Sequence, residues 1–171
     1  MVAVILIDTI ESPLGPLTAG ERGGRVCLLH FGQDGPAIDQ MFERWYPGEP
    51  RNRRQVEGIR GVLGRYFAGE VAALDHVPVE LNGTPFQKTV WQALRRIPGG
   101  TTISYAELAK RIGDPAAVRA VGTANGANPV AVIVPCHRVI GSNGKLTGYG
   151  GGLDRKQWLL EHEGVVSRSL F

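Results

Sequence analysis

Cys136, His137 and Arg138 follow one another directly after an apolar run, residues 130–134. Positive charge beside a thiol lowers its pKa, and the thiolate rather than the thiol is the nucleophile. The apolar run predicts a buried strand that ends at the cysteine. We therefore interpret Cys136 as a candidate nucleophile, although so short a motif does not choose between kinds of thiol chemistry.

Length and composition are typical of one ordinary globular domain or two small ones, with 171 residues, 43% of them hydrophobic and 20% charged. No apolar run approaches the roughly 18 residues of a membrane span, so no membrane partner is expected. The start of the chain lacks a basic region, so no secretory signal is expected. Cys27 and Cys136 are far apart and differently embedded, which favours reduced thiols and a cytoplasmic location over a disulfide.

Charge is distributed unevenly along the chain. Up to Gly83 there are 8 Lys and Arg against 11 Asp and Glu, whereas from Thr84 onward there are 11 against 5. A basic half favours a polyanion as partner, and the alternative is an ordinary solvated basic surface.

The first half predicts a small α/β unit. Apolar, β-branched runs between turn signals predict an antiparallel meander over residues 2–31. Two helices are expected near 37–45 and 53–68, the second with apolar residues at helical spacing. A short strand near 77–81 is expected to close the unit, and Asn82-Gly83 is a natural domain boundary.

The second half predicts mostly helix and loop. Thr84 and Gln87 predict a capping box at the start of one helix. Ser104 and Glu107 predict the same for a short second helix, and a tight turn leads to a third helix that reaches Asn125. This order is that of a helix-turn-helix, and a plain helical hairpin within a core is the equal alternative.

The third helix carries small residues along one side and a single arginine, Arg119, one turn in. A slim helix with one arginine suits the minor groove of DNA, and tight packing between helices explains the small residues equally well. A last helix is expected over 154–163, followed by Gly164. The glycine-rich stretch 148–152 lacks the spacing of a phosphate loop, which argues against nucleotide binding.

The residues around Cys136 resemble the active-site signature of the O6-alkylguanine-DNA alkyltransferases, also called methylated-DNA–protein-cysteine methyltransferases. The resemblance to this family is strong over residues 84–164 and limited to a few short segments before them. Further segments that carry it are Ser104-Tyr105, Leu108-Ala109, Arg119-Ala120-Val121-Gly122, Asn128-Pro129, Gly148-Tyr149-Gly150-Gly151, Trp158-Leu159-Leu160 and His162-Glu163-Gly164. The resemblance implies an α+β fold, with a ribonuclease-H-like domain over 1–83 and a winged-helix DNA-binding domain over 84–171.

The resemblance also implies a reaction. Cys136 would take the alkyl group from O6 of guanine in duplex DNA, in one irreversible step that consumes the protein, with O4-alkylthymine as a second substrate left open. His137 would act as base through a water molecule, and Glu163 would orient its imidazole. Asn128 would tie the DNA-reading helix to the active-site turn. The damaged base would flip out of the duplex to reach the thiol.

Roles in DNA binding follow from the same resemblance. Tyr105 would contact the phosphate or the base edge, and Arg119 would fill the space that the flipped base leaves. The backbone carbonyls of Cys136 and Val139 would accept hydrogen bonds from the guanine amino group. We expect a monomer that contacts the minor groove and phosphates. The other residues implied in DNA or base binding are Ala120, Gly122, Arg138, Tyr149 and Gly150.

No cofactor is implied, and a structural zinc ion is not expected. Cys27 and His30 fall on opposite faces of a predicted strand, and His76 is the only other candidate ligand in the first half. We interpret Cys27 as a small core residue.

Four other functions compete with alkyl transfer. A lesion sensor of the same architecture carries tryptophan in place of the cysteine, which is present here. A cysteine hydrolase needs a direct Cys-His couple, and adjacent residues on an extended strand point to opposite faces. A DNA-binding regulator and an inert buried thiol are the remaining alternatives.

Overall fold

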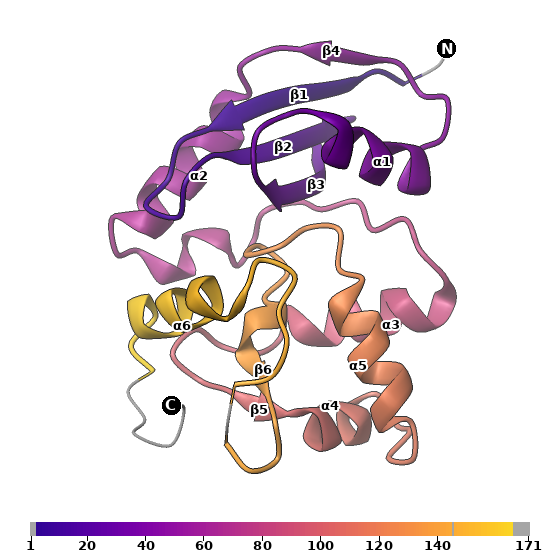
Figure 1. Cartoon of the computed structure of the whole chain (residues 1–171), viewed down its shortest axis with the longest axis vertical. Coiled ribbons are helices and arrows are strands. Elements are labelled where there is room, and N and C mark those ends of the chain that lie inside the picture. The colour runs from indigo at the N-terminus through magenta and orange to yellow at the C-terminus, as the bar shows by residue number, and fades with distance from the viewer. Residues whose placement is uncertain (1–2, 145, 166–171) are drawn as a thin grey trace. The chain divides into compact units, whose positions relative to one another are not determined.

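The structure, a computed structural model, describes residues 3–144 and 146–165 (Figure 1). The chain divides into two compact units of an α+β protein. The first contains the residues up to Asn82 together with Pro129–Ile133, and the second contains Gly83–Asn128 and the chain from Val134 onward. The segment just before the candidate nucleophile therefore belongs to the first unit.

A four-stranded mixed sheet, in the order β3-β2-β1-β4, is the centre of the first unit (Figure 1). β1 (Ile5–Ile10), β2 (Leu17–Arg22) and β3 (Arg25–Phe31) pair antiparallel, which confirms the predicted meander. β4 (Arg51–Arg53) pairs in parallel with β1. The polar triplet Arg-Asn-Arg has no strand propensity, so only its backbone pairing reveals it as a strand.

Two helices and one 3-10 turn complete this unit: α1 (Pro36–Trp45), α2 (Glu57–Phe67) and η1 (Val71–Leu74). α2 begins later than predicted because Arg53 is used by β4. Asp8 on β1 accepts hydrogen bonds from the Val56 amide at 2.9 Å and from Arg60 at 2.6 Å, and so joins the sheet to α2. The strand predicted near 77–81 is wrong, since only Val79 forms a bridge there.

The second unit begins with α3 (Pro85–Leu94). Its predicted capping box is confirmed, because Thr84 and Gln87 each accept a hydrogen bond from the other's amide. The indole of Trp91 donates to the carbonyl of Ala124 at 2.8 Å and fastens α3 to α5 (Val118–Gly126).

β5 (Ile103–Ser104) and α4 (Tyr105–Arg111) precede a tight turn and α5 (Figure 1). The second capping box is only half formed, since Ser104 accepts from the Glu107 amide while the Glu107 carboxylate binds Arg111 instead. α5 begins only at Val118, because the Ala117 amide closes a turn on the Asp114 carbonyl ahead of it.

The predicted strand over 130–134 is also wrong. Val130 makes one bridge to Leu29, and the chain then turns sharply, with Val132 at a φ of 70°. The Ile133 amide bonds to the carbonyl of Ala131 at 2.8 Å, which closes a three-residue turn. A β-branched residue at positive φ is strained and persists only where surrounding packing imposes it.

A 3-10 turn, η2 (Cys136–Arg138), follows this irregular segment. β6 (Val139–Ile140) pairs in parallel with β5, and α6 (Leu153–His162) ends the described fold. The Leu159 and Leu160 side chains of α6 are fully buried. Among the described residues, no helix is long and apolar enough to cross a membrane.

Candidate active site

The candidate nucleophile, Cys136, is the first residue of η2 and is 7% exposed. Burial raises the pKa of its thiol above the ordinary value, although a hydrogen bond from Asn128 and the charge of Lys156 oppose the shift. The expectation that neighbouring positive charge lowers this pKa on balance is therefore wrong. The resting group is a thiol, and it needs a base to become a nucleophile.

His137 and Glu163 form a buried pair behind the thiol. His137 Nε2 lies 2.8 Å from Glu163 Oε2, and both side chains are fully shielded from solvent. Burial lowers the pKa of His137 below its ordinary value, more than the Glu163 charge raises it. A neutral imidazole that donates its Nε2 proton to Glu163 has its lone pair on Nδ1. Nδ1 has no hydrogen-bond partner among residues 3–144 and 146–165, so it is free to accept a proton.

Arg138 holds the carboxylate of this pair. Its Nε donates to Glu163 Oε1 at 2.7 Å, its Nη2 to Oε2 at 3.0 Å, and its Nη1 to the carbonyl of Ile97 at 2.7 Å. Burial raises the pKa of Glu163, but His137 and Arg138 lower it further, so the carboxylate stays ionised. At 4% exposure the Arg138 side chain is buried, and the structure shows it bound to Glu163 and to the backbone rather than projecting from the surface.

Lys156 is a site residue that sequence reasoning missed. Its side chain is fully buried, and its ammonium donates to the carbonyl of Val139 at 2.8 Å and to that of Thr147 at 3.1 Å. Burial lowers its pKa to about 8, and its electrostatic interaction with Cys136 opposes that shift. Helical spacing carried the signal, because Lys156 shares one face of α6 with Leu159 and Leu160.

Two asparagines, Asn125 on α5 and Asn128 two residues beyond its end, bind the segment that holds the active-site turn. Asn128 Nδ2 donates to the carbonyl of Val134 at 2.7 Å, which agrees with the tie that the family resemblance implies. Asn125, which sequence reasoning missed, donates from Nδ2 to the carbonyl of Cys136 at 3.4 Å. Its position beside Val121 and Ala124 on the buried face of α5 was the available signal.

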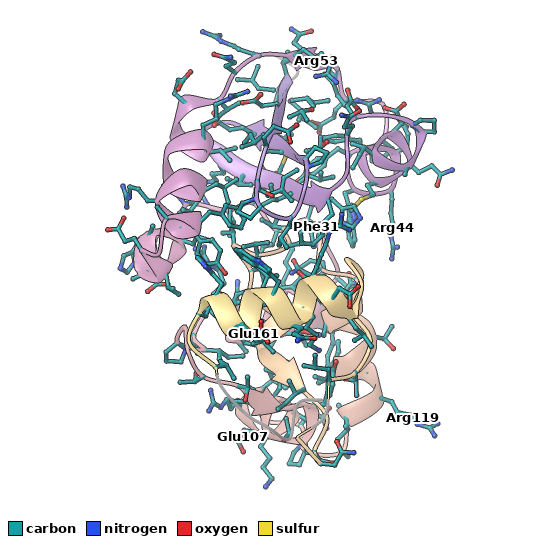
Figure 2. The ribbon with its side chains drawn as sticks, turned by 60° about the vertical axis from the view of Figure 1, so that its left-hand side comes forward. Phe31, Arg44, Arg53, Glu107, Arg119 and Glu161 are labelled. Carbon is teal, nitrogen blue, oxygen red and sulfur yellow. The ribbon has the colours of Figure 1, made fainter. Side chains whose placement is uncertain are left out.

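The residues expected to meet DNA lie on and beside α5. Arg119 and Ala120 are exposed, and Figure 2 shows Arg119 projecting outward from the helix. Gly122 lies close to Tyr105, since a Cβ at this glycine would be 3.9 Å from Tyr105 Cδ1. The Tyr105 hydroxyl accepts a hydrogen bond from Thr147 at 3.1 Å.

Tyr149 and Gly150 lie in the loop between β6 and α6. Tyr149 is half-buried and Gly150 is exposed. Apart from its chain neighbours, a Cβ at Gly150 would meet no atom of the described residues within 4 Å, so the described loop is open at this point. Val139, by contrast, is fully buried.

The zinc candidates of the first unit do not form a site. Cys27 is fully buried on β3, and burial raises the pKa of its thiol to about 12. His30 is half-buried and His76 is exposed. In the described ranges, no three His, Cys, Asp or Glu side chains gather as metal ligands would.

A buried thiol backed by a neutral imidazole and an ionised carboxylate defines a protein with a base-activated cysteine nucleophile. Residues 85–165 match the sequence model of the 6-O-methylguanine DNA methyltransferase DNA-binding domain. The methylated-DNA–protein-cysteine methyltransferase of Mycolicibacterium paratuberculosis is 50% identical over 91% of this chain and 90% of the relative. That of Salmonella typhimurium is 46% identical over 95% and 97%.

A crystal structure of Mycobacterium tuberculosis OGT in complex with DNA has a TM-score of 0.77 and 44% identity, and the match covers 94% of this chain and 92% of that one. The chain belongs to the methylated-DNA–protein-cysteine methyltransferase family.

Proposed function

We propose that the protein repairs DNA by direct reversal, with Cys136 as the acceptor of the alkyl group from O6-alkylguanine. The observation that carries the proposal is the His137–Glu163 pair at 2.8 Å with an unpartnered Nδ1 among the described residues. A raised thiol pKa makes such a base necessary, because a buried thiol does not ionise unaided at neutral pH. Family membership supplies the substrate class.

The proton moves first. A water molecule between the Cys136 thiol and His137 Nδ1 takes the thiol proton as it passes its own to the imidazole. Glu163 stabilises the imidazolium that forms, and Arg138 keeps Glu163 ionised. The ammonium of Lys156 favours the thiolate electrostatically. This is the cysteine-histidine-acid logic of hydrolases applied to an alkyl acceptor.

The alkyl group then moves in a single displacement. The thiolate sulfur forms a bond to the alkyl carbon while the bond from that carbon to guanine O6 breaks. Its electron pair stays with the base, which takes one proton and becomes guanine. The product is a thioether, a poor leaving group, so each molecule reacts once.

We infer that the second unit is a winged helix and the first is ribonuclease-H-like. α4, the tight turn and α5 supply the helix-turn-helix, and β5 with β6 supplies the small sheet. The order β3-β2-β1-β4 with β4 parallel to β1 supports the assignment of the first unit. In this proposal α5 enters the minor groove, Arg119 fills the gap that the flipped base leaves, and Tyr105 contacts a phosphate.

The base pocket is proposed to lie between Val139 and the loop of Tyr149 and Gly150. Ala120 and Gly122 let the backbone of α5 approach the groove closely. Because Gly150 is open, larger O6 adducts such as benzyl are expected to react. We place the protein in the cytoplasm as a monomer, since DNA and reduced thiols are both available there.

Intact mass after incubation with a duplex carrying one O6-methylguanine tests the proposal. Wild type should gain the mass of one CH2 group and stop at one equivalent, and Cys136→Ser should gain nothing. A product released in many equivalents would indicate a cysteine hydrolase. Binding without mass gain would indicate a lesion sensor or regulator, and either result would overturn alkyl transfer.

A further inference from the structure

The hydroxyl of Tyr105 is bound by a side chain of the loop between β6 and α6. Thr147 Oγ1 lies 3.1 Å from Tyr105 Oη and donates a hydrogen bond to it. Tyr105 is the first residue of α4, and Thr147 lies 42 residues further along the chain, within the same unit. The contact therefore joins the helix-turn-helix to a loop that the sequence places far from it.

The ring of Tyr105 is held in place independently of this contact. The preceding residue, Ser104, pairs with Ile140 in the small sheet and caps α4 with its side chain. A Cβ at Gly122 would lie 3.9 Å from Tyr105 Cδ1, so one edge of the ring lies against α5. With the backbone and the ring edge fixed in this way, Thr147 fixes the hydroxyl end of the side chain.

Thr147 is anchored from the side opposite its hydroxyl. Its carbonyl accepts a hydrogen bond at 3.1 Å from Nζ of Lys156, a fully buried side chain on α6. The same ammonium donates to the carbonyl of Val139 on β6 at 2.8 Å. Gly148, with its wider backbone freedom, comes only after this anchored residue. Thr147 thus presents a fixed donor at the start of a glycine-rich stretch.

The direction of the hydrogen bond matters for an anionic partner. A phosphodiester oxygen only accepts hydrogen bonds, and a tyrosine hydroxyl has one proton to donate. When Thr147 donates, Tyr105 keeps its own proton for the phosphate, and a hydroxyl that accepts a hydrogen bond is polarised into a stronger donor. The reverse direction would turn the Tyr105 proton toward Thr147 and present a lone pair to the phosphate. A donor at position 147 therefore favours phosphate binding by Tyr105.

Stability gives little reason for this contact. Thr147 is exposed and Tyr105 is half-buried, so water can replace either hydroxyl at small cost. The consequence of the contact is geometric, because it holds the Tyr105 hydroxyl in one place before DNA arrives. A side chain that is ordered in advance loses less conformational entropy on binding.

We propose that Thr147 is a positioning residue that orients the Tyr105 hydroxyl toward the DNA phosphate, and so sets how strongly the protein prefers a damaged base in duplex DNA to the same base free in solution. The inference rests on the proposed function, since the phosphate contact of Tyr105 belongs to that proposal. Thr147 acts through Tyr105 and takes no part in the bond that Cys136 forms.

The experiment measures the second-order rate constant of transfer from a duplex with one O6-methylguanine and from the free O6-methylguanine base, by intact mass. Thr147→Val keeps the shape of the side chain and removes its donor, whereas Thr147→Ser keeps the hydroxyl. Thr147→Val should lower the duplex rate about threefold to tenfold, the effect of one hydrogen bond, and leave the free-base rate unchanged. Thr147→Ser should retain the wild-type ratio of the two rates.

Two further variants separate orientation of Tyr105 from a general effect on the loop. Tyr105→Phe should lower the duplex rate at least as much as Thr147→Val, and the double variant should react no more slowly than Tyr105→Phe alone. Thr89→Val is the matched control, because Thr89 is exposed on α3 and its hydroxyl donates to the carbonyl of Pro85 at 2.9 Å. It should leave both rates at the wild-type value.

The outcomes distinguish this inference from the proposed function. An unchanged rate ratio in Thr147→Val, an equal loss with both substrates, a further loss on the Tyr105→Phe background or a lost ratio in Thr147→Ser would each overturn the positioning role. Alkyl transfer to Cys136 would stand in all four cases. No transfer from duplex by wild type would overturn the proposed function, and the positioning role with it.

Discussion

Glu163 accepts a hydrogen bond from His137 at 2.8 Å across 26 residues of sequence, with both side chains removed from solvent. Glu163 caps the C-terminus of α6, so the pair forms only when that helix has packed against η2. A buried pair contributes little net stability, yet removal of one partner is strongly destabilising because the other charge is left alone. Catalysis and stability are therefore linked at this pair.

Replacement of Glu163 by Gln removes the negative charge of the side chain but keeps a hydrogen-bond acceptor at the same position. The amide still accepts from His137, but Arg138 loses its buried counter-ion. We expect the free energy of unfolding to fall by about 3 to 5 kcal/mol and the transfer rate to fall roughly 10²-fold. Urea unfolding and transfer from free O6-benzylguanine measure the two effects.

Glu161 offers the matched control. It lies two residues away on the same helix, is exposed and is labelled in Figure 2. Glu161→Gln should change stability by less than about 0.5 kcal/mol and leave the rate unchanged. Similar behaviour of the two variants would contradict the role of the buried charge.

Lys156 makes stability depend on pH above neutrality. Its pKa falls from 10.5 to about 8 in the folded protein because of burial. Between these values the unfolded chain holds a proton that the folded protein has released, so the free energy of unfolding rises with pH by up to about 1.4 kcal/mol per unit. Urea unfolding at both ends of this range should show the rise in wild type and not in Lys156→Met. If the free energy of unfolding changed with pH equally in wild type and in Lys156→Met, Lys156 would keep its ordinary pKa in the folded protein.

Position 83 requires glycine because its backbone lies close to the Trp91 ring. A Cβ at Gly83 would lie 2.6 Å from the Trp91 ring, and that ring is held by its bond to Ala124. Gly83→Ala should therefore lower the free energy of unfolding by about 1 to 3 kcal/mol. Gly61→Ala, on α2 with no atom within 4 Å, should instead raise it by about 0.5 to 1 kcal/mol. Thermal unfolding of both variants checks the contrast, and equal losses would argue against the steric cause.

Arg119 should affect the rate of alkyl transfer only when the damaged base must leave a duplex. Base flipping costs a few kcal/mol, so Arg119→Ala should slow transfer from duplex DNA about 10²-fold. Transfer from free O6-benzylguanine should be unchanged, because Arg119 is exposed on α5 and takes no part in the thiol chemistry of the proposed mechanism. A loss with both substrates would show that the substitution damages the active site itself.

Methylation of Cys136 should destabilise the protein. The thiol lies in a closely packed site at 7% exposure, and an added methyl group must displace its neighbours. Overpacking of this kind costs about 1 to 3 kcal/mol. The melting temperature before and after reaction with one equivalent of methylated DNA measures it, and an unchanged value would mean that the site has room for the product.

Local signals in the sequence predicted much of the fold. The meander, the first capping box and the last helix follow from turn residues, caps and spacing, and the structure contains all three. β4 could not be predicted, because the pairing of Arg51–Arg53 with β1 is a long-range backbone interaction. The strand predicted over 130–134 is wrong for a related reason. The apolar composition of this segment suits a strand, but packing forces Val132 to positive φ.

Some residues of the candidate site were predicted from the sequence and others were not. Cys136 and His137 are adjacent in a recognisable motif, and the family resemblance supplied Glu163. Arg138 was expected only among the residues for DNA or base binding, and its charge gave no sign that its side chain would bind Glu163 in the interior. Lys156 and Asn125 bind backbone carbonyls, and such acceptors leave no mark in the sequence.

The assignment of Pro129–Ile133 to the first unit limits how the chain can be cut. Leu29 on β3 exchanges backbone hydrogen bonds with this segment, donating to the carbonyl of Pro129 and accepting from the amide of Ala131. A fragment starting at Gly83 would retain the nucleophile but lose the strand edge that orders the stretch leading to it. Its apolar residues would then be exposed, and such stretches drive aggregation. The first half of the chain therefore supplies the strand that orders the segment leading to Cys136, and a fragment from Gly83 onward is expected to lack this order.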